Sequence, residues 1–597
     1  MSGTLTELII ERHSKSGEQP AIRFWNGKEW ISLTWSEFIW RVAEIGLGLE
    51  VTGLKRGEVV NILAATGFDW AAIDLGTLVA GGVSVGLYPT LTPEQVRYQL
   101  DHSDSVCLFV ENQALYDRIR PILRELTKLR YIIAINPVTD PAESRLMPLE
   151  AVLSKGANMN ARDSTTWMHR ANQASPDDLA VLVYTSGTTG PPKGAMLTHR
   201  NIRAFVDRIP EMLPIKGTDH TVAFLPMAHV AERVVGHYGR LNTGASVTFA
   251  RSPETLVEDI GLAKPDFFGS VPRIFEKIHG KFVEGLERMP PEKRRLAEWA
   301  VDMGRQHSRV IQRRGKPGLW LSIRHRVAKA LVLGKLKDKL GGRVRFLISG
   351  AAPISYDLLE FFHAFDLLPL EVYGLTESSA ICTANTPDAY RFGSVGKAIP
   401  GIEIQIAPDG EILIKGDLVF KGYFKEPGAT AETFRDGWLC TGDIGELDSD
   451  GFLKITDRKK NIIITAGGKN IAPAGIENLL KSHPLVGQAL YHGDRRKFPS
   501  ALIVLDPEAA PAWAKSRNLP PTLAELARHP DLLAEIGTHV EKVNQSLAQY
   551  EQVKKWMVVP EEFTVDNGLL TSTLKVRRKE VETRYREVLD GFYQGEH

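Results

Sequence analysis

Cysteine, net charge and long apolar runs are all scarce in this chain of 597 residues. Its three cysteines, Cys107, Cys382 and Cys440, lie far apart and form neither a Cys-x-x-Cys pair nor a cluster with histidines. This spacing excludes a disulfide framework and a readable zinc site, and it favours a reducing, cytoplasmic compartment. The 73 Lys and Arg residues nearly balance the 72 Asp and Glu residues, which leaves no whole-molecule field for wrapping nucleic acid.

The chain also lacks a stretch suited to crossing a membrane. Its most apolar window, Leu75 to Tyr88, spans about 14 residues and contains four glycines, whereas a spanning helix needs about 20 residues. We predict that this window is a buried helix that runs into a strand of a parallel sheet. The N-terminal apolar stretch carries Glu7, Glu11 and Arg12, which is unlike a secretory signal.

Apolar β-branched runs alternate with amphipathic stretches through most of the chain. The runs at 180–184, 247–250 and 344–348 are each followed by Gly, Ser or Pro and then by a helical pattern, which predicts an α/β fold built from βαβ units. After about residue 400 the runs become short, with Asp-Gly pairs at 409–410 and 450–451. These pairs predict hairpin turns and a smaller α+β domain.

Positive charge is concentrated between residues 276 and 345, where there are 19 Lys and Arg but only 7 Asp and Glu. One interpretation is a basic amphipathic helix on an anionic membrane surface, where each nearby Lys or Arg adds about 1 kcal/mol. The other, which we favour, is a helix packed on the core with a solvated basic face. The apolar residues at roughly helical spacing are Trp320, Leu321, Ile323, Val327, Leu331, Leu336 and Leu340.

The strongest local signal is the segment 184–194, which reads YTSGTTGPPKG directly after an apolar run. Such a loop offers backbone N–H groups, hydroxyls and a lysine to phosphate oxygens, although a purely structural glycine loop is the alternative. It is not a P-loop of the NTPases. Pro192 stands where the second glycine of that motif is required, and Lys193 is followed by Gly194 instead of Ser or Thr.

Further motifs follow in a fixed order: GAAP at 350–353, YGLTE at 373–377, TGDIG at 441–445, DRKK at 457–460, and Lys575. With the glycine-rich loop, they make the chain resemble the adenylate-forming superfamily of acyl- and aryl-CoA synthetases, adenylation domains and luciferases over nearly its whole length. Within that superfamily it most resembles the long-chain fatty acid CoA ligases, on segments 224–233, 264–277 and 457–473.

The resemblance implies an α/β fold with a large, multi-subdomain N-terminal domain of mixed and parallel sheets and a small mobile α+β C-terminal domain. The expected boundaries are 1–457 for ATP and acyl binding, a hinge at 458–460 that includes Lys460, and 461–597 for the mobile domain, with the active site between the domains. The implied reaction is the ATP-dependent activation of a fatty acid to an acyl-adenylate, followed by transfer to CoA. Its products are acyl-CoA, AMP and pyrophosphate.

The resemblance also implies roles for individual residues. Glu377 would hold Mg²⁺ together with Thr185, and Asp443 would accept both ribose hydroxyls with Arg458 nearby. Tyr373 would stack on adenine. The phosphate loop is Thr185, Ser186, Gly187, Thr188, Thr189, Gly190 and Lys193, and the residues beside Tyr373 at the nucleotide are Gly350, Ala351, Gly374 and Thr376.

Two residues would act on the reacting groups. Lys575 would reach the α-phosphate and the attacking carboxylate, and His229 would lie between that carboxylate and the phosphates. Each motif residue also has an ordinary interpretation: Tyr373 as a core aromatic, Asp443 as a turn residue, Lys575 as part of a solvated basic run. The chain departs from the usual pattern at two places, with Thr573-Leu574 before the lysine and Gly475 where most members have Glu.

Other functions stay open from sequence alone. They are an aryl- or other-acid CoA ligase, a fatty acyl-AMP ligase, and a catalytically silent lipid- or nucleotide-binding relative. We expect fatty acid, ATP and CoA as partners. We also consider a homodimer, and a peripheral contact of 276–345 with the inner face of a membrane. A tunnel for a long acyl chain would gain about 0.8 kcal/mol per buried CH₂, but its length cannot be derived from the linear sequence.

Overall fold

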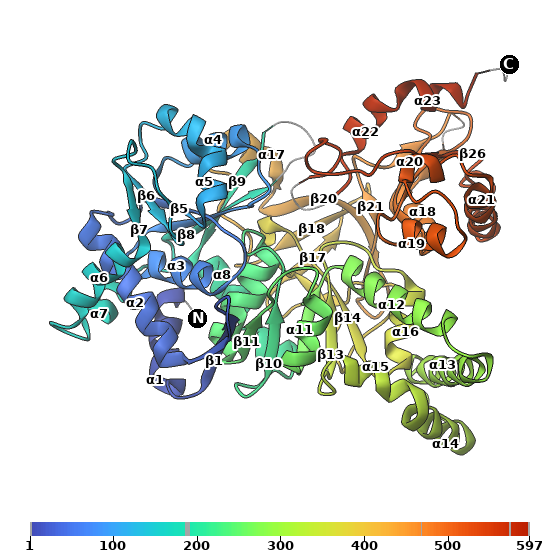
Figure 1. Cartoon of the computed structure of the whole chain (residues 1–597), viewed down its shortest axis with the longest axis horizontal. Helices are drawn as coiled ribbons and strands as arrows, with labels where there is room; N and C mark the ends of the chain where they lie inside the picture. Colours follow the sequence, from blue (N-terminus) through green and yellow to red (C-terminus); the bar gives the residue numbers. More distant parts are fainter. Residues whose placement is uncertain (1–2, 186–190, 467–468, 572–574, 595–597) are drawn as a thin grey trace. The chain divides into compact units, whose positions relative to one another are not determined.

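The computed structural model describes residues 3–185, 191–466, 469–571 and 575–594, and Figure 1 shows their arrangement. The chain divides into two compact units. Both contain helices and sheets, which confirms the expected mixed α/β class with a large and a smaller domain. Unit 1 comprises Met1–Ala352, Leu358–Ile404 and Ile414–Cys440, and unit 2 comprises Pro353–Asp357, Gln405–Leu413 and Thr441–His597.

A seven-stranded sheet of unit 1 has the strand order β7-β6-β5-β3-β4-β8-β9. Neighbouring strands from β7 to β8 are parallel, and β9 pairs antiparallel with β8. Strands β3 and β4 are buried along their whole length, as expected for strands that are covered on both faces. The bounds are β3 Val59–Leu63, β4 Val83–Leu87, β5 Ser105–Val110, β6 Tyr131–Ala134, β7 Leu146–Pro148, β8 Leu179–Thr185 and β9 Lys193–Thr198.

The predicted helix-to-strand window is confirmed. Helix α3 (Phe68–Val79) ends shortly before β4 begins, and every residue from Leu75 to Tyr88 except Ala80 and Gly81 is buried. Helix α2 (Trp35–Thr52) packs against α3. The apolar run is therefore explained by burial in a parallel βαβ unit.

Unit 1 contains two further sheets, in the orders β12-β13-β14-β15-β16 and β10-β11-β1-β2. Strands β12, β13 and β14 are parallel, so their carboxyl ends lie at one edge. The strands predicted at 247–250 and 344–348 correspond to β11 and β13. The bounds are β1 Pro20–Trp25, β2 Trp30–Thr34, β10 His220–Ala223, β11 Ser246–Phe249, β12 Phe267–Ser270, β13 Phe346–Ser349, β14 Leu368–Tyr373, β15 Thr383–Ala384 and β16 Lys397–Ala398.

The short strands predicted after residue 400 are also present. They follow the order β17-β18-β20-β19, and β21 pairs antiparallel with β20. Gly410 and Gly451 have φ values of +84° and +82°, which fits the two predicted Asp-Gly turns because glycine tolerates this region. The bounds are β17 Glu403–Ile406, β18 Glu411–Lys415, β19 Phe434–Arg435, β20 Trp438–Leu447 and β21 Leu453–Arg458.

Unit 2 contains the three-stranded sheet β24-β25-β26 with an apolar cluster on each face. Ile503 belongs to one cluster, while its neighbours Leu502 and Val504 belong to the other, as the two-residue period of a strand requires. Helices α18 and α21 contribute to the first cluster, and α22 and α23 to the second. The bounds are α18 Pro473–Leu480, α21 Pro530–Gln545, α22 Arg578–Arg584, α23 Arg586–Gly591, β24 Val486–His492, β25 Ser500–Leu505 and β26 Lys555–Val559.

The basic stretch 276–345 is largely helical, but the single apolar stripe expected there is wrong. Leu336 and Leu340 are buried, whereas Trp320, Ile323, Val327 and Leu331 are exposed. The π-helical turn η3 contains Leu331, the last exposed member, and precedes the buried pair, and its wider turn changes which side of the helix faces the core. The bounds are α12 Pro272–Glu287, α13 Pro291–Gln312, α14 Leu319–Ala328, η3 Lys329–Leu333 and α15 Gly334–Lys339.

Within the described ranges, no helix combines the length and the apolar character that a membrane span requires.

A buried ionic network joins α3 and β4 to the π-helix η2 (Ala231–Tyr238). The Asp74 carboxylate, fully buried on α3, is paired with the Arg233 guanidinium and accepts hydrogen bonds from the Tyr238 hydroxyl at 2.7 Å and the Ser84 hydroxyl at 2.6 Å. Arg233 also lies over the ring of Trp70, 5.2 Å from its centroid. Burial raises the pKa of Tyr238 well above its usual value, so its hydroxyl stays a donor.

Replacing one partner of this network should destabilise unit 1. We expect Asp74→Ala to lower the free energy of unfolding by about 3–5 kcal/mol, because the Arg233 charge would stay buried without its counter-ion. The double variant Asp74→Leu/Arg233→Met should recover part of that loss, because it removes both charges.

Urea denaturation followed by circular dichroism measures these changes. Asp117→Ala is the matched control, since Asp117 is an exposed helical carboxylate, and it should stay within about 0.5 kcal/mol of the parent. An Asp74→Ala protein as stable as the control would contradict the role given to the network.

Candidate active site

Strand β8 leads into the glycine-rich loop and β9 leads out of it. Thr185, the last residue of β8, lies opposite Lys193, the first residue of β9, and its hydroxyl is 3.5 Å from the Lys193 carbonyl oxygen. The antiparallel pair thus fixes both ends of the loop at the carboxyl end of a parallel strand. The expected phosphate ligands Ser186, Gly187, Thr188, Thr189 and Gly190 lie outside the described residues.

Tyr423 joins this loop to the acidic motif. Its ring lies under the Lys193 ammonium, with Nζ 5.1 Å from the ring centroid, and its hydroxyl donates a 2.6 Å hydrogen bond to Glu377 Oε1. The neighbouring backbone is also fixed, because Phe424 N–H donates to the Gly194 carbonyl at 2.8 Å. Lys193 and Glu377, 184 residues apart in sequence, therefore contact the same side chain.

Sequence reasoning missed Tyr423. The one local signal is the preceding Gly422, whose φ of +130° favours glycine. A Gly-Tyr pair is common in turns, so this signal does not point to a site by itself.

Glu377 lies in a 3₁₀ turn, Thr376–Ser378, that follows β14. Its carbonyl oxygen accepts a 2.9 Å hydrogen bond from Phe420 N–H, and its side chain is half-buried. The Glu377 carboxylate and the Thr185 hydroxyl are hard oxygen donors of the kind that Mg²⁺ binds, and Tyr423 orients the carboxylate through one oxygen. The donor set therefore fits magnesium.

The carboxyl ends of β13 and β14 lie next to each other because the two strands are parallel. Gly350 and Ala351 follow β13, and Tyr373 and Gly374 close β14. Gly374 admits no side chain, because a Cβ atom there would lie 1.5 Å from the Ala380 carbonyl oxygen. This edge offers exposed backbone beside a largely buried aromatic ring, which suits a flat heterocycle.

Glu371, two residues before Tyr373 on β14, is a second acid of this region that the sequence analysis did not single out. Burial raises its pKa to about 8, and its carboxyl accepts a 3.1 Å hydrogen bond from Gly393 N–H. Burial thus favours the protonated form of this carboxyl group.

His229 lies just before η2, and its Nδ1 accepts a 3.1 Å hydrogen bond from Ala231 N–H. In the neutral ring the proton is therefore on Nε2, which can donate to an anionic group. The segment rests on the seven-stranded sheet: Thr66 Oγ1 donates to the Leu225 carbonyl at 2.7 Å, and Gly86 of β4 approaches Ala228 so closely that a Cβ atom there would lie 2.7 Å from its Cα. His229 is held at a defined position by these contacts.

In unit 2, Asp443 and Arg458 lie opposite each other on β20 and β21. Arg458 Nε is 2.9 Å from Asp443 Oδ1, and the Asp443 carboxylate is nearly buried. The turn before it is fixed because Thr441 Oγ1 accepts from Asp443 N–H at 3.0 Å and donates to the Ile412 carbonyl at 2.7 Å. Sequence reasoning expected Asp443 and Arg458 at the same sugar, and they do lie together.

Lys575 of unit 2 is exposed, and it lies next to an isolated antiparallel bridge between Leu570 and Val576. Its backbone pairs with Thr571, whose N–H donates to the Lys575 carbonyl at 2.8 Å and whose hydroxyl accepts from Lys575 N–H at 3.1 Å. The departure at Thr573-Leu574 lies outside the described residues. Lys460, just after β21, is exposed as well, and Gly475 on α18 has open space where a side chain would extend.

Known proteins resemble this chain over its whole length. The long-chain-fatty-acid–CoA ligase FadD15 of Mycobacterium bovis is 36% identical over 571 residues, which cover 95% of this chain and 93% of that protein. The peroxisomal long chain acyl-CoA synthetase 7 of Arabidopsis thaliana is 32% identical, over 95% of this chain and 82% of that protein.

Solved structures share the fold. The adenylation domain of a carboxylate reductase from Mycobacterium chelonae superimposes with a TM-score of 0.75 at 23% identity, covering 99% of this chain and 91% of that one. The anthranilate CoA ligase AuaEII, solved with anthranoyl-AMP, gives a TM-score of 0.72 at 19% identity, covering 99% and 98%.

Two family descriptions match nearly all of the sequence. Residues 10–424 match the family described as AMP-binding enzyme, and residues 460–597 match the AMP-binding enzyme C-terminal domain. The chain therefore belongs to the AMP-binding enzyme family.

Proposed function

We propose that this protein is an AMP-forming acid–thiol ligase that activates a long-chain fatty acid with ATP and transfers the acyl group to CoA. The observation that supports it most is the contact of Tyr423 with both Lys193 and Glu377, which joins a cation and an oxygen ligand beside the phosphate loop. The long-chain preference follows the named relatives, which are 32–36% identical to this chain.

The first step needs charge neutralisation more than a base, because a fatty acid is already a carboxylate at pH 7. One carboxylate oxygen forms a bond to the α-phosphorus as the bond to the bridging oxygen breaks and pyrophosphate leaves. The CoA sulfur then attacks the acyl carbon, its proton is lost, and AMP leaves. Lys193 and Lys575 supply positive charge at the phosphates, and His229 donates from Nε2 toward the carboxylate.

Magnesium is part of the proposal. Thr185 and Glu377 would hold the ion, which would neutralise phosphate charge when bound. Tyr423 keeps the Glu377 carboxylate oriented by its hydrogen bond. The phosphate contacts from 186–190 belong to the same proposal.

The proposal also assigns the nucleotide contacts. Tyr373 stacks on adenine beside Gly350, Ala351, Gly374 and Thr376. Asp443 accepts the two ribose hydroxyls with its carboxylate oxygens, and Arg458 keeps that carboxylate aligned through their ion pair.

We place the N-terminal domain at 1–457, the hinge at 458–460 and the C-terminal domain at 461–597. The exposed Lys460 just after β21 is the rotation point in this proposal.

The competing functions are aryl- or other-acid CoA ligase activity, acyl-AMP ligase activity and a silent binding relative. The proposal further includes a cytoplasmic location, a homodimer, and a peripheral contact of 276–345 with the inner face of a membrane.

Pyrophosphate release from Mg-ATP tests the substrate class. We expect release to rise from eight to sixteen carbons, because each buried CH₂ contributes up to about 0.8 kcal/mol, and AMP turnover to require CoA. A benzoate-type acid should be a poor substrate. Release without any dependence on CoA would identify an acyl-AMP ligase instead, and no release with any acid would identify a silent relative.

Removing the Lys575 ammonium should slow adenylation. We expect Lys575→Ala to lower the rate of fatty-acid-dependent pyrophosphate release by about 10²–10³-fold, since one positive charge at the transition state is lost. Lys579→Ala, at an exposed lysine of α22, is the control and should stay within about twofold. Equal rates for the two variants would overturn the assignment.

Removing the Tyr423 hydroxyl should weaken magnesium use. We expect Tyr423→Phe to raise the Mg²⁺ concentration for half-maximal pyrophosphate release by about 10-fold or more, because the Glu377 carboxylate loses its orienting donor. Tyr550→Phe, at an exposed tyrosine, should leave it unchanged. An unchanged magnesium requirement in Tyr423→Phe would show that the hydrogen bond does not serve the ion.

A further inference from the structure

Helix α14 and the π-turn η3 carry a continuous row of exposed hydrophobic side chains. The row follows a spacing of three or four residues, which places it on one face of the helix. Leu319 and Trp320 are the most exposed large hydrophobic side chains that the structure describes, at 76% each. The remaining members, Ile323, Val327 and Leu331, are 44%, 46% and 45% exposed.

The opposite face of the same helix is packed. His325, Ala328 and Leu333 are buried, and α14 contacts α13. The exposed row is therefore not the face that the helix uses to join unit 1, and its apolar surface has no partner among the described residues.

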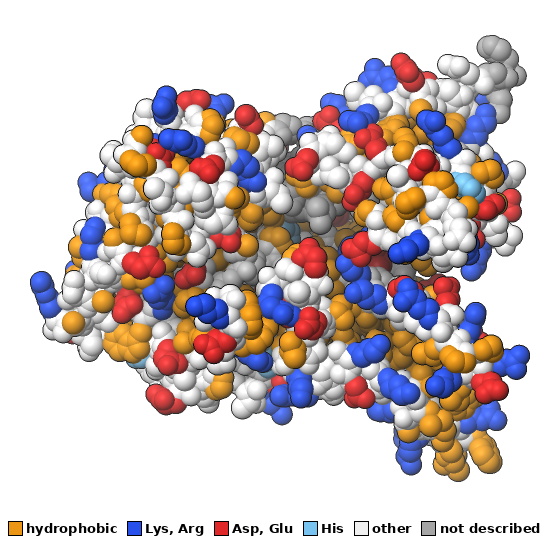
Figure 2. Space-filling model, viewed as in Figure 1, with side chains coloured by type: hydrophobic (Ala, Val, Ile, Leu, Met, Phe, Trp, Pro, Cys, Tyr) orange, Lys and Arg blue, Asp and Glu red, His pale blue; other side chains and the backbone are white. Residues whose placement is uncertain are grey.

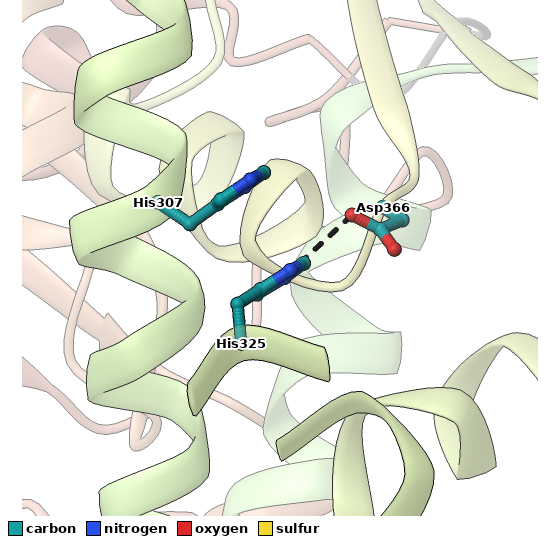
Figure 3. Close-up of side chains that lie close together, drawn as sticks. All are labelled: His307, His325 and Asp366. Atoms are coloured by element: carbon teal, nitrogen blue, oxygen red, sulfur yellow. Dashed lines mark ion pairs between the residues drawn. The ribbon is translucent and has the colours of Figure 1, made fainter. Parts of the chain in front are cut away.

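Four side chains anchor the inner face, and Figure 3 shows three of them. His307 of α13 and His325 of α14 stack with ring centroids 3.9 Å apart and planes parallel within 1°, and His325 Nε2 points at Asp366 Oδ1 at 3.8 Å. Lys329 Nζ lies 2.5 Å from Asp366 Oδ2. A metal ion lies near the plane of each imidazole that ligates it, so two stacked rings cannot share one ion as they stand. The arrangement instead holds α14 firmly against α13 and Asp366.

The segment that carries the exposed row has charged residues of one sign only. From residue 313 to residue 337 the sequence contains eight Lys and Arg and no Asp or Glu. Lys316, Arg324 and Arg326 are exposed, and none of them forms an ion pair with a described residue. Figure 2 shows hydrophobic side chains gathered over α14 at the lower edge of the view, with Lys and Arg side chains beside them.

We propose that this face of α14 and η3 docks on an anionic phospholipid surface. A row of Leu, Ile, Val and Trp with basic residues along its borders fits the headgroup region, because the apolar side chains enter the acyl boundary while Lys and Arg meet lipid phosphates. The proposal narrows the membrane contact of 276–345 to residues 316–333. Docking on lipid does not require ligase activity, so the docking proposal and the ligase proposal can each be wrong without the other.

Vesicle flotation of the full-length protein tests it, with phosphatidylcholine vesicles that contain or lack about one-third phosphatidylglycerol. We expect binding to the anionic vesicles only, and at least tenfold weaker binding in 0.5 M NaCl, because surface attraction is screened by salt. Trp320→Ser/Ile323→Ser should weaken binding at least tenfold by removing apolar insertion. Arg324→Glu/Arg326→Glu should weaken it more, since each basic residue near the surface contributes about fivefold.

The controls are matched in exposure. Leu262→Ser replaces a hydrophobic side chain that is 48% exposed elsewhere, and Lys28→Glu/Lys55→Glu reverses two exposed charges elsewhere. Both should bind as the parent does, and all variants should keep the parent's circular dichroism and its turnover of a soluble short-chain acid.

Three outcomes would overturn the proposal. They are equal binding to neutral vesicles, no binding at all, and variants of the α14 face that bind as well as the controls. Light scattering after size-exclusion chromatography tests the alternative that a second copy of the chain covers this face. If Trp320→Ser/Ile323→Ser converts a dimer to a monomer in the absence of lipid, the face is an interface between two copies of the chain.

Discussion

A fully buried carboxylate needs a cation or hydrogen-bond donors beside it, and Asp74 imposes this constraint on the centre of unit 1. Its partners come from β4 and from η2, so pairing the charge fixes a π-helix against a parallel sheet. π-helical segments are rare, and in η2 this pairing ties Arg233 and Tyr238 to α3. His229 and the loop before it lead directly into this segment and pack on the same sheet.

The parallel sheets supply the second part of the site. Strands β8, β13 and β14 each end at the carboxyl edge of a parallel array, and each ends in a motif that the sequence marks: Thr185, Gly350 and Tyr373. Tyr423 then combines two different interactions, since its ring faces the Lys193 cation while its hydroxyl holds the Glu377 carboxylate. A change at this one side chain would affect both Lys193, at the end of the glycine-rich loop, and the expected metal ligand Glu377.

The proposed docking of the exposed α14 face would bring the enzyme to the membrane in which long-chain acids dissolve. Long-chain acids partition into bilayers, so an enzyme that used them would gain local substrate concentration from lying on the same surface. The stacked pair of His307 and His325, with Asp366 and Lys329, supports that face from behind. The helix can then present hydrophobic side chains to the outside without loosening unit 1.

The sequence by itself determined the α/β class, the helix-to-strand window at 75–88, the Asp-Gly turns and the order of the motifs, because these depend on local periodicity and on turn chemistry. Tertiary structure decided the rest. Tyr423 became part of the site because it contacts Glu377 across 46 residues of sequence, which no local pattern records. The apolar row at 320–340 divided into an exposed and a buried face because one π-turn shifted the helical phase, and phase depends on how the helix packs.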